Sequence, residues 1–171
     1  MTVSLPRLAG ERVLLRPLEE ADLDGLVEIV WSEGVREWWG WCASREELRA
    51  ELPNEGAAFA IEVGRELAGW LGVSEELDPG YRSAGMDIML AVAFQGAGIG
   101  PEALRLAARW LIEERGHHRL TIDPAAANAR AIRAYESVGF RPVGIMRNYE
   151  RGADGVWHDG LLMDMLAEEL R

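Results

Sequence analysis

A glycine-rich run, Gln95-Gly-Ala-Gly-Ile-Gly100, is the segment of this 171-residue chain whose composition points most directly to chemistry. It follows a mostly apolar stretch, Met86–Phe94, and precedes Pro101, which suits the first turn of a helix. Glycines let a backbone approach a ligand closely, and free amides at the start of a helix bind phosphate oxygens. The run therefore predicts an anion-binding turn between a strand and a helix. The other interpretation is a plain connection between the two elements.

Two aspartates stand at positions where a carboxylate could act on a substrate. Asp87 lies inside the apolar stretch, and strand alternation places it on the same face as Met89 and Ala91. A partly buried carboxylate there needs a partner, which is either a cationic amine whose proton it accepts or an arginine of another strand. Asp123 ends the next expected strand just before Pro124, where shaping a turn and binding a substrate are both open.

Three tryptophans, Trp38, Trp39 and Trp41, lie within four positions of one another. One helix or strand could not turn all three toward one core, and the neighbouring Glu37 and Gly40 favour a loop over a cleft. Aromatic faces in such a loop suit a sugar ring or a cation, and the alternative is a hydrophobic plug beneath the loop.

The reactive residue types are few. Cys42 is expected to be an inert thiol, because neither His117-His118 nor His158 has a spacing that implies a partner for it. The histidines and carboxylates form no recognisable zinc pattern, so no metal is expected.

The charges of the chain exclude several functions. There are 29 acidic residues against 18 basic ones, and every basic residue is an arginine. Without lysine, a phosphate-binding loop of the G-x-x-x-x-G-K-[ST] type and Schiff-base chemistry on a lysine are both excluded. The formal net charge of −11 disfavours nucleic acid and attracts cations, so a small cationic partner is expected.

A single domain over residues 1–171 is expected from the length and from the 49% of hydrophobic residues. Because Cys42 is the only cysteine, no internal disulfide can form, which favours a reducing compartment. The first residues lack the apolar core of a signal peptide, and no apolar run approaches the roughly 20 residues that cross a bilayer. We therefore expect a cytoplasmic protein with no membrane partner.

Hydrophobic spacing and turn residues predict a mixed α/β domain with the order β-α-α-β-β-β-α-β-α-β-β. Strands are expected over residues 11–18, 57–63, 67–74, 86–94, 120–123, 141–149 and 157–166. Helices are expected over 22–31, from a capping box at Ser44, from Pro101 until Gly116, and from Asn128 to Val138.

Tyr135 lies on the last of these helices, on the same face as Ile132 three residues before it. Packing in the core is the ordinary role of such a tyrosine.

Two motifs together give the chain a resemblance to the GCN5-related N-acetyltransferase (GNAT) family. The acetyl-CoA motif of the family, [QR]-x-x-G-x-[GA], is matched by Gln95–Gly100 at every defined position. Its second motif, N-x-x-A-x-x-x-Y-x-x-x-G-F, is matched by Asn128, Ala131, Tyr135, Gly139 and Phe140. The order of elements also fits, so the resemblance covers nearly the whole chain.

The resemblance implies the GNAT fold, a mixed and strongly twisted sheet of about seven strands flanked by about four helices. The fourth and fifth strands of that sheet splay apart, and acetyl-CoA enters the gap with its pyrophosphate on the glycine loop and its pantetheine along the fourth strand. The cofactor-binding residues implied are Leu90, Ala91, Val92, Gln95, Gly96, Ala97, Gly98, Ile99, Gly100, Asn128, Ala131 and Tyr135.

A nearer likeness within the family is to aminoglycoside 6′-N-acetyltransferases. Glu37-Trp-Trp-Gly40 resembles their tryptophan pair, and Gly85-Met-Asp-Ile-Met-Leu-Ala91 resembles their G-x-D-x-x-[LI]-A. Residues 123–135 resemble their D-P-x-x-x-N-x-R-A-I-x-x-Y. This likeness implies that the acceptor-binding residues are Trp38, Trp39, Asp87 and Asp123.

The resemblance also implies a mechanism in which a neutral amine attacks the thioester directly. Asp87 accepts the proton of the amine, a backbone amide of the fourth strand stabilises the oxyanion, and Tyr135 protonates the coenzyme A thiolate. Two features depart from the family pattern. The link before Gln95 is short, and Ala97 stands where many relatives have a basic residue.

The preferred acceptor is an aminoglycoside-like amino sugar, and two alternatives stay open. The segment Arg7–Pro17 also resembles the ribosomal-protein branch of the family, so one alternative is a peptide N-terminus or a small polyamine. The other is a non-catalytic acyl-CoA-binding module, against which the presence of Asp87 and Tyr135 argues. A monomer or a homodimer is expected.

Overall fold

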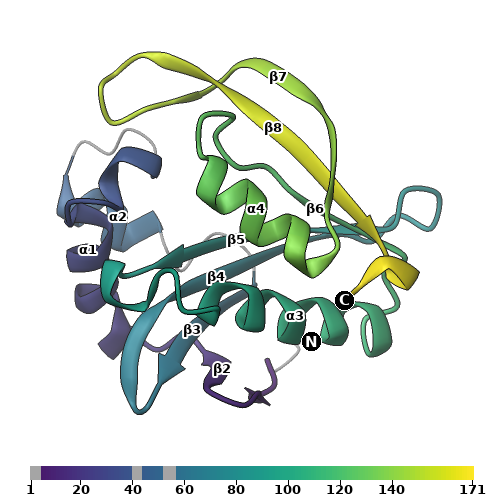
Figure 1. Cartoon of the computed structure of the whole chain (residues 1–171). Coiled ribbons are helices and arrows are strands. Elements are labelled where there is room, and N and C mark those ends of the chain that lie inside the picture. Colours follow the sequence, from purple (N-terminus) through teal and green to yellow (C-terminus); the bar gives the residue numbers. More distant parts are fainter. Residues whose placement is uncertain (1–4, 40–43, 52–56) are drawn as a thin grey trace.

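The computed structural model describes residues 5–39, 44–51 and 57–171, which form one open sheet with helices against both faces (Figure 1). The eight described strands lie in the order β1-β2-β3-β4-β5-β6-β8-β7. Their bounds are β1 (Leu8–Ala9), β2 (Val13–Pro17), β3 (Ala57–Val63), β4 (Glu66–Glu76), β5 (Ser83–Leu90), β6 (Arg119–Ile122), β7 (Arg141–Arg151) and β8 (Trp157–Leu166). The described α-helices are α1 (Leu23–Trp31), α2 (Arg45–Glu51), α3 (Ile99–Glu113) and α4 (Ala129–Val138).

Strands β3 and β4 each contribute to two cores, because successive side chains of a strand point to opposite faces of the sheet. Phe59 and Leu71 belong to the larger core, which α3 covers. Ala58 and Trp70 belong to a smaller core that α1 covers with its buried leucines and valines. The sheet is therefore buried on both faces at β3 and β4.

The sheet opens between β5 and β6, which are its only parallel neighbours among the described strands. Their pairing is limited to Ala84 with Leu120 and Gly85 with Thr121. The remainder of β5, as far as Leu90, pairs with β4 alone. The carboxyl end of β5 is thus left with one unpaired edge, which is the splayed gap predicted from the family resemblance.

The predicted order of elements and the mixed α/β architecture are confirmed. The sheet has eight described strands where about seven were expected, because the two residues of β1 pair with β2. The strand expected over 86–94 ends at Leu90. The Ala91 amide still donates a hydrogen bond to the Ala68 carbonyl of β4. The next residues form a short 3-10 helix, η4 (Val92–Phe94), in which the amides of Phe94 and Gln95 donate to the carbonyls of Ala91 and Val92.

Helix α3 begins at Ile99, two residues before the proline that was expected to open it. Pro101 occupies the first turn, where backbone N–H groups have no partner within the helix, so its lack of an N–H costs no helical hydrogen bond. Helix α4 follows the prediction closely, with Asn128 at its N-cap and Gly139 at its C-cap. No helix in the described part of the chain has the length and apolar character needed to span a bilayer.

Candidate active site

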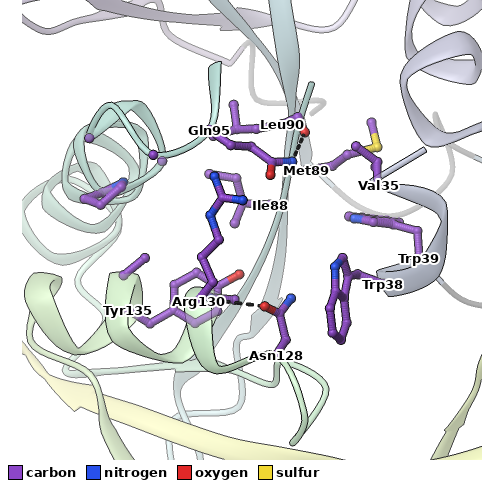
Figure 2. A pocket seen from close by; sticks show the side chains of 17 residues that line it. Val35, Trp38, Trp39, Ile88, Met89, Leu90, Gln95, Asn128, Arg130 and Tyr135 are labelled. Carbon is purple, nitrogen blue, oxygen red and sulfur yellow. Dashed lines mark hydrogen bonds between the residues drawn. The ribbon is translucent and has the colours of Figure 1, made fainter. Parts of the chain in front are cut away.

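A cavity of about 330 Å³ lies at the open end of β5 (Figure 2). Four segments surround it: the end of β5, the glycine-rich loop with the start of α3, one face of α4, and the chain around the 3-10 helix η2 (Arg36–Trp38). Among its lining residues are the predicted site residues Trp38, Trp39, Leu90, Gln95, Gly96, Gly98, Gly100, Asn128, Ala131 and Tyr135. We call this space the main cavity.

The glycine-rich loop has the backbone of an anion cradle. Gly96 and Gly98 adopt φ angles of 77° and 82°, a region that disfavours residues with a Cβ. Gly98 is the N-cap of α3, and no side chain caps the helix, so the first amides of α3 are left for a ligand. The Gln95 side chain donates to the Leu90 carbonyl at 2.8 Å, which ties the loop to the end of β5.

One face of α4 forms the opposite wall of the main cavity. Ala131, Ala134 and Tyr135 lie three, six and seven residues after Asn128, which is the spacing of one helical face, and all of them line the cavity. The Asn128 side-chain oxygen accepts a hydrogen bond from the Ala131 amide at 3.1 Å and caps the helix. The amide nitrogen of that side chain carries the donors that a ligand could use.

Tyr135 is partly buried against Phe140, with the two ring centroids 6.5 Å apart. Burial raises the pKa of its phenol above the ordinary value of 10.0, and the negative charges of Asp87 and Asp123 raise it further. The negative charges of both predicted aspartates are therefore felt at Tyr135, although neither aspartate lines the main cavity.

Asp87 is exposed, whereas a partly buried carboxylate was expected. The physical reason is the opening of the sheet: Asp87 lies beyond Gly85, where β6 no longer runs beside β5. Asp87 therefore lies on the part of β5 that pairs with β4 alone.

Asp123 has a partner that the sequence did not reveal. The Tyr149 hydroxyl, on β7, donates a hydrogen bond to Asp123 Oδ2. This bond, followed by burial and by the nearby carboxylates, raises the pKa of Tyr149 to about 12. No local motif connects two residues that are 26 positions apart, so only the fold could identify Tyr149 as a site residue.

The two described tryptophans of the cluster both line the main cavity but pack differently. Trp39 packs edge-on against Trp70, with a centroid distance of 5.5 Å, and so extends the smaller core. Trp38 is 38% exposed and lies over the main cavity. Trp41 and Cys42 lie outside the described residues.

A second cavity, of about 760 Å³, lies between η2 and the hairpin of β7 and β8. Trp38 lines it as well as the main cavity. We call it the acidic cavity, because its lining includes four carboxylates and a second tryptophan, namely Glu37, Glu150, Asp154, Asp159 and Trp157. Burial raises the pKa of Glu150, and the negative charge of Asp123 adds to the shift.

Some predicted cofactor residues do not line the main cavity. Ala91 and Val92 have turned away with η4, and Val92 is 50% exposed. Ala97 and Ile99 belong to the loop but contribute no lining surface. Conversely, Arg130 on α4 lines the cavity, and it was not among the predicted site residues although it stands inside the second motif.

Residues 12–141 match the family model described as the acetyltransferase (GNAT) domain. A relative, the aminoglycoside N(6′)-acetyltransferase type 1 of Klebsiella pneumoniae, is 31% identical over an alignment covering 80% of this chain and 77% of that protein.

Solved structures agree with the family match. The crystal structure of an acetyltransferase from T. thermophilus covers 99% of this chain and 93% of its own, with a TM-score of 0.83 and 27% identity. Mycobacterium smegmatis RimJ in complex with CoA-disulfide covers 92% of this chain and 83% of its own, with a TM-score of 0.79 and 26% identity.

Proposed function

The chain belongs to the GNAT acetyltransferase family and is an acetyl-CoA-dependent N-acetyltransferase, and we propose that its acceptor is the 6′-amine of an aminoglycoside-like amino sugar. The observation that carries the proposal is the acidic cavity, which shares Trp38 with the main cavity. The sequence similarity to an aminoglycoside N(6′)-acetyltransferase supports the same acceptor.

The acidic cavity suits a ligand with several ammonium groups and sugar rings. Its carboxylates can accept charge-assisted hydrogen bonds from ammonium groups, although Asp154 already bonds His158 and Asp159 already accepts from the Asn148 amide. Trp38 and Trp157 offer faces on which a sugar ring or a cation can stack. An acceptor seated there would extend past Trp38 toward the gap beside Asp87, where its reacting amine would lie.

We assign acetyl-CoA to the main cavity, since the residues present fit it. The uncapped backbone amides of residues 96–100 would hold its pyrophosphate, and the glycine conformations leave room for a close approach. Leu90, Asn128 and Ala131 would contact the pantetheine arm. The bound group supplies an activated acetyl thioester.

The residues of this chain then divide the proton transfers. Asp87 accepts the proton of the attacking amine. A backbone amide of β5 stabilises the oxyanion; it lies beyond Gly85, where β5 no longer pairs with β6. Tyr135 donates its proton to the departing sulfur as negative charge develops there; its raised pKa keeps the phenol protonated beforehand but also makes it a weaker acid. Asp123, held by Tyr149, binds a second amine or a hydroxyl of the acceptor.

The acceptor is tested by following the release of free thiol from acetyl-CoA with kanamycin, spermidine and an N-terminal ribosomal-protein peptide in parallel. We expect turnover with kanamycin, and mass spectrometry with NMR should place the acetyl group on the 6′-amine. Turnover with the peptide and none with any aminoglycoside would overturn the proposed acceptor. Acetyl-CoA binding without turnover of any amine would favour a non-catalytic module.

A matched pair of variants tests the acidic cavity. Glu150→Gln removes a half-buried carboxylate from it, and we expect the KM for kanamycin to rise about tenfold because a charge-assisted contact is lost. Glu113→Gln removes an exposed carboxylate at the end of α3 and should leave the KM unchanged. Equal KM values for the two variants would exclude the acidic cavity from acceptor binding.

A further inference from the structure

The glycine-rich loop has no cationic side chain of its own, although the ligand assigned to it carries a diphosphate. Backbone amides supply hydrogen bonds but only a partial positive charge. The whole chain has a formal net charge of −11, so its summed field repels an anionic ligand. A cationic side chain from another part of the fold would supply the charge that the loop lacks.

We propose that Arg130, on the first turn of α4, supplies this charge and binds the diphosphate of coenzyme A. The inference rests on the placement of acetyl-CoA proposed above. Arg130, on α4, would then take the place of the basic residue that many relatives have in the loop at the position of Ala97.

The position of Arg130 supports direct contact with the ligand. Its guanidinium Nη2 lies 3.3 Å from the point that a Cβ would occupy at Gly96. Figure 2 shows the side chain rising from α4 across the cavity toward Gln95. The residue is exposed and lines the main cavity, so a ligand on the loop would meet the guanidinium without any rearrangement of the backbone.

Arg12 also lies beside the loop, with its Nη2 3.1 Å from the point that a Cβ would occupy at Gly98, but its charge is already balanced. Its Nη1 donates to the Ala97 carbonyl at 2.7 Å, and its Nε is 3.2 Å from Glu102 Oε2. Arg130, by contrast, makes no ion pair with any carboxylate in the part of the chain that the structure describes. Of the two guanidiniums beside the loop, Arg130 is therefore the one with a charge to give to a phosphate.

Calorimetric titration of the full chain tests the proposal without depending on activity. The ligands are coenzyme A, dephospho-coenzyme A, which lacks only the 3′-phosphate, and pantetheine, which lacks all phosphates. The variant is Arg130→Gln. The control is Arg133→Gln, which removes the same charge from an exposed position of the same helix that does not line the cavity.

We expect Arg130→Gln to raise the Kd about tenfold for both coenzyme A and dephospho-coenzyme A, which is the loss of one partly exposed charge-assisted contact. Its Kd for pantetheine should stay unchanged. The Kd of the variant should also depend less on salt, because one screened contact has been removed. Arg133→Gln should bind all three ligands like the unmodified protein.

Three results would overturn the proposal. Equal losses in the Arg130→Gln and Arg133→Gln variants would reduce the effect to net charge. A loss for coenzyme A but not for dephospho-coenzyme A would place Arg130 at the 3′-phosphate. A loss that extends to pantetheine would indicate damage to α4. Kanamycin turnover by the unmodified protein is measured separately, so a failure of the proposed acceptor leaves the binding result interpretable.

Discussion

At the scale of single residues, burial sets the protonation of Tyr135, and the charges of Asp87 and Asp123 add to the effect. Burial and these negative charges raise the pKa of Tyr135 above its ordinary value of 10.0. The phenol therefore stays protonated throughout the neutral range, where it can donate a hydrogen bond but cannot act as a base. Acceptance of the amine proton would consequently fall to a carboxylate, and we propose Asp87 for this role because it lies on the part of β5 that β6 leaves unpaired.

Replacing Asp87 by asparagine should lower turnover with kanamycin by a factor on the order of 10² or more, the range for a lost general base. The amide keeps the shape of the side chain but cannot take a proton. Thiol release gives the rate, and calorimetry should show an unchanged Kd for coenzyme A. Glu66→Gln, an exposed change at the start of β4, serves as the control. Unchanged turnover in Asp87→Asn would remove Asp87 from the proposed mechanism.

Tyr135→Phe isolates the phenol from the ring. The phenylalanine should still pack against Phe140, so the Kd for coenzyme A and the thermal midpoint should hardly change. We expect kcat to fall about tenfold to a hundredfold because the leaving sulfur loses its proton donor. A normal kcat would mean that water supplies this proton. A lowered midpoint would instead show that the hydroxyl of Tyr135 stabilises the fold.

At the scale of secondary-structure elements, the sequence predicted those parts of the site whose residues are adjacent in the chain. The loop over Gln95–Gly100 and helix α4 were predictable, because turn glycines, an N-cap and helical spacing are read from adjacent residues. Tyr149 and the acidic cavity were not predictable, because they depend on where the β7–β8 hairpin lies relative to η2. The exposure of Asp87 was likewise set by how far β6 runs beside β5.

The joint between β2 and α3 gives a prediction at this scale. Glu102 accepts hydrogen bonds from the amides of Arg12 and Val13 at 2.7 and 3.0 Å, and Arg12 in turn holds the glycine loop. Glu102→Ala should lower the free energy of unfolding by about 2 kcal/mol, since bonds to a charged acceptor are lost together. Urea denaturation measures the change. Glu113→Ala, an exposed change on the same helix, should stay within about 0.5 kcal/mol. A similar loss in both variants would show that the joint contributes nothing specific.

At the scale of the whole molecule, three carboxylates bond residues of other elements and make stability depend on pH. Hydrogen bonds from Arg16 lower the pKa of Asp22. Burial works to raise the pKa values of Glu75 and Glu102, but hydrogen bonds outweigh it and lower both: Glu75 is bonded by His117 and Arg115, and Glu102 by backbone amides. Because all three pKa values are lower in the folded state, their contribution is complete above the ordinary values of 3.8 and 4.5.

Below those ordinary values the unfolded chain binds protons first, so the free energy of unfolding should fall as the pH is lowered through the folded-state pKa values. Urea denaturation at about pH 7, 5, 4 and 3 should show a plateau followed by this decline. Glu75→Gln should lower the plateau and make the decline shallower, because one of the three linked groups is gone. A decline of the same steepness in the variant would mean that Glu75 is not linked to folding.

The excess of negative charge should also govern how the acceptor binds. A field from a chain with net charge −11 attracts a polycation, and the acidic cavity concentrates that field beside Trp38. Raising the salt concentration from about 20 to about 500 mM shortens the screening length to a few ångströms, so the KM for kanamycin should rise several-fold. With acetyl-CoA kept saturating, kcat should change by less than about twofold, because the reacting groups are in contact. A sugar with a single amine should show a much smaller rise in KM. An equal rise in KM for both acceptors would indicate a general effect of salt on the enzyme. It would mean that the acidic cavity does not recognise the charges of the acceptor.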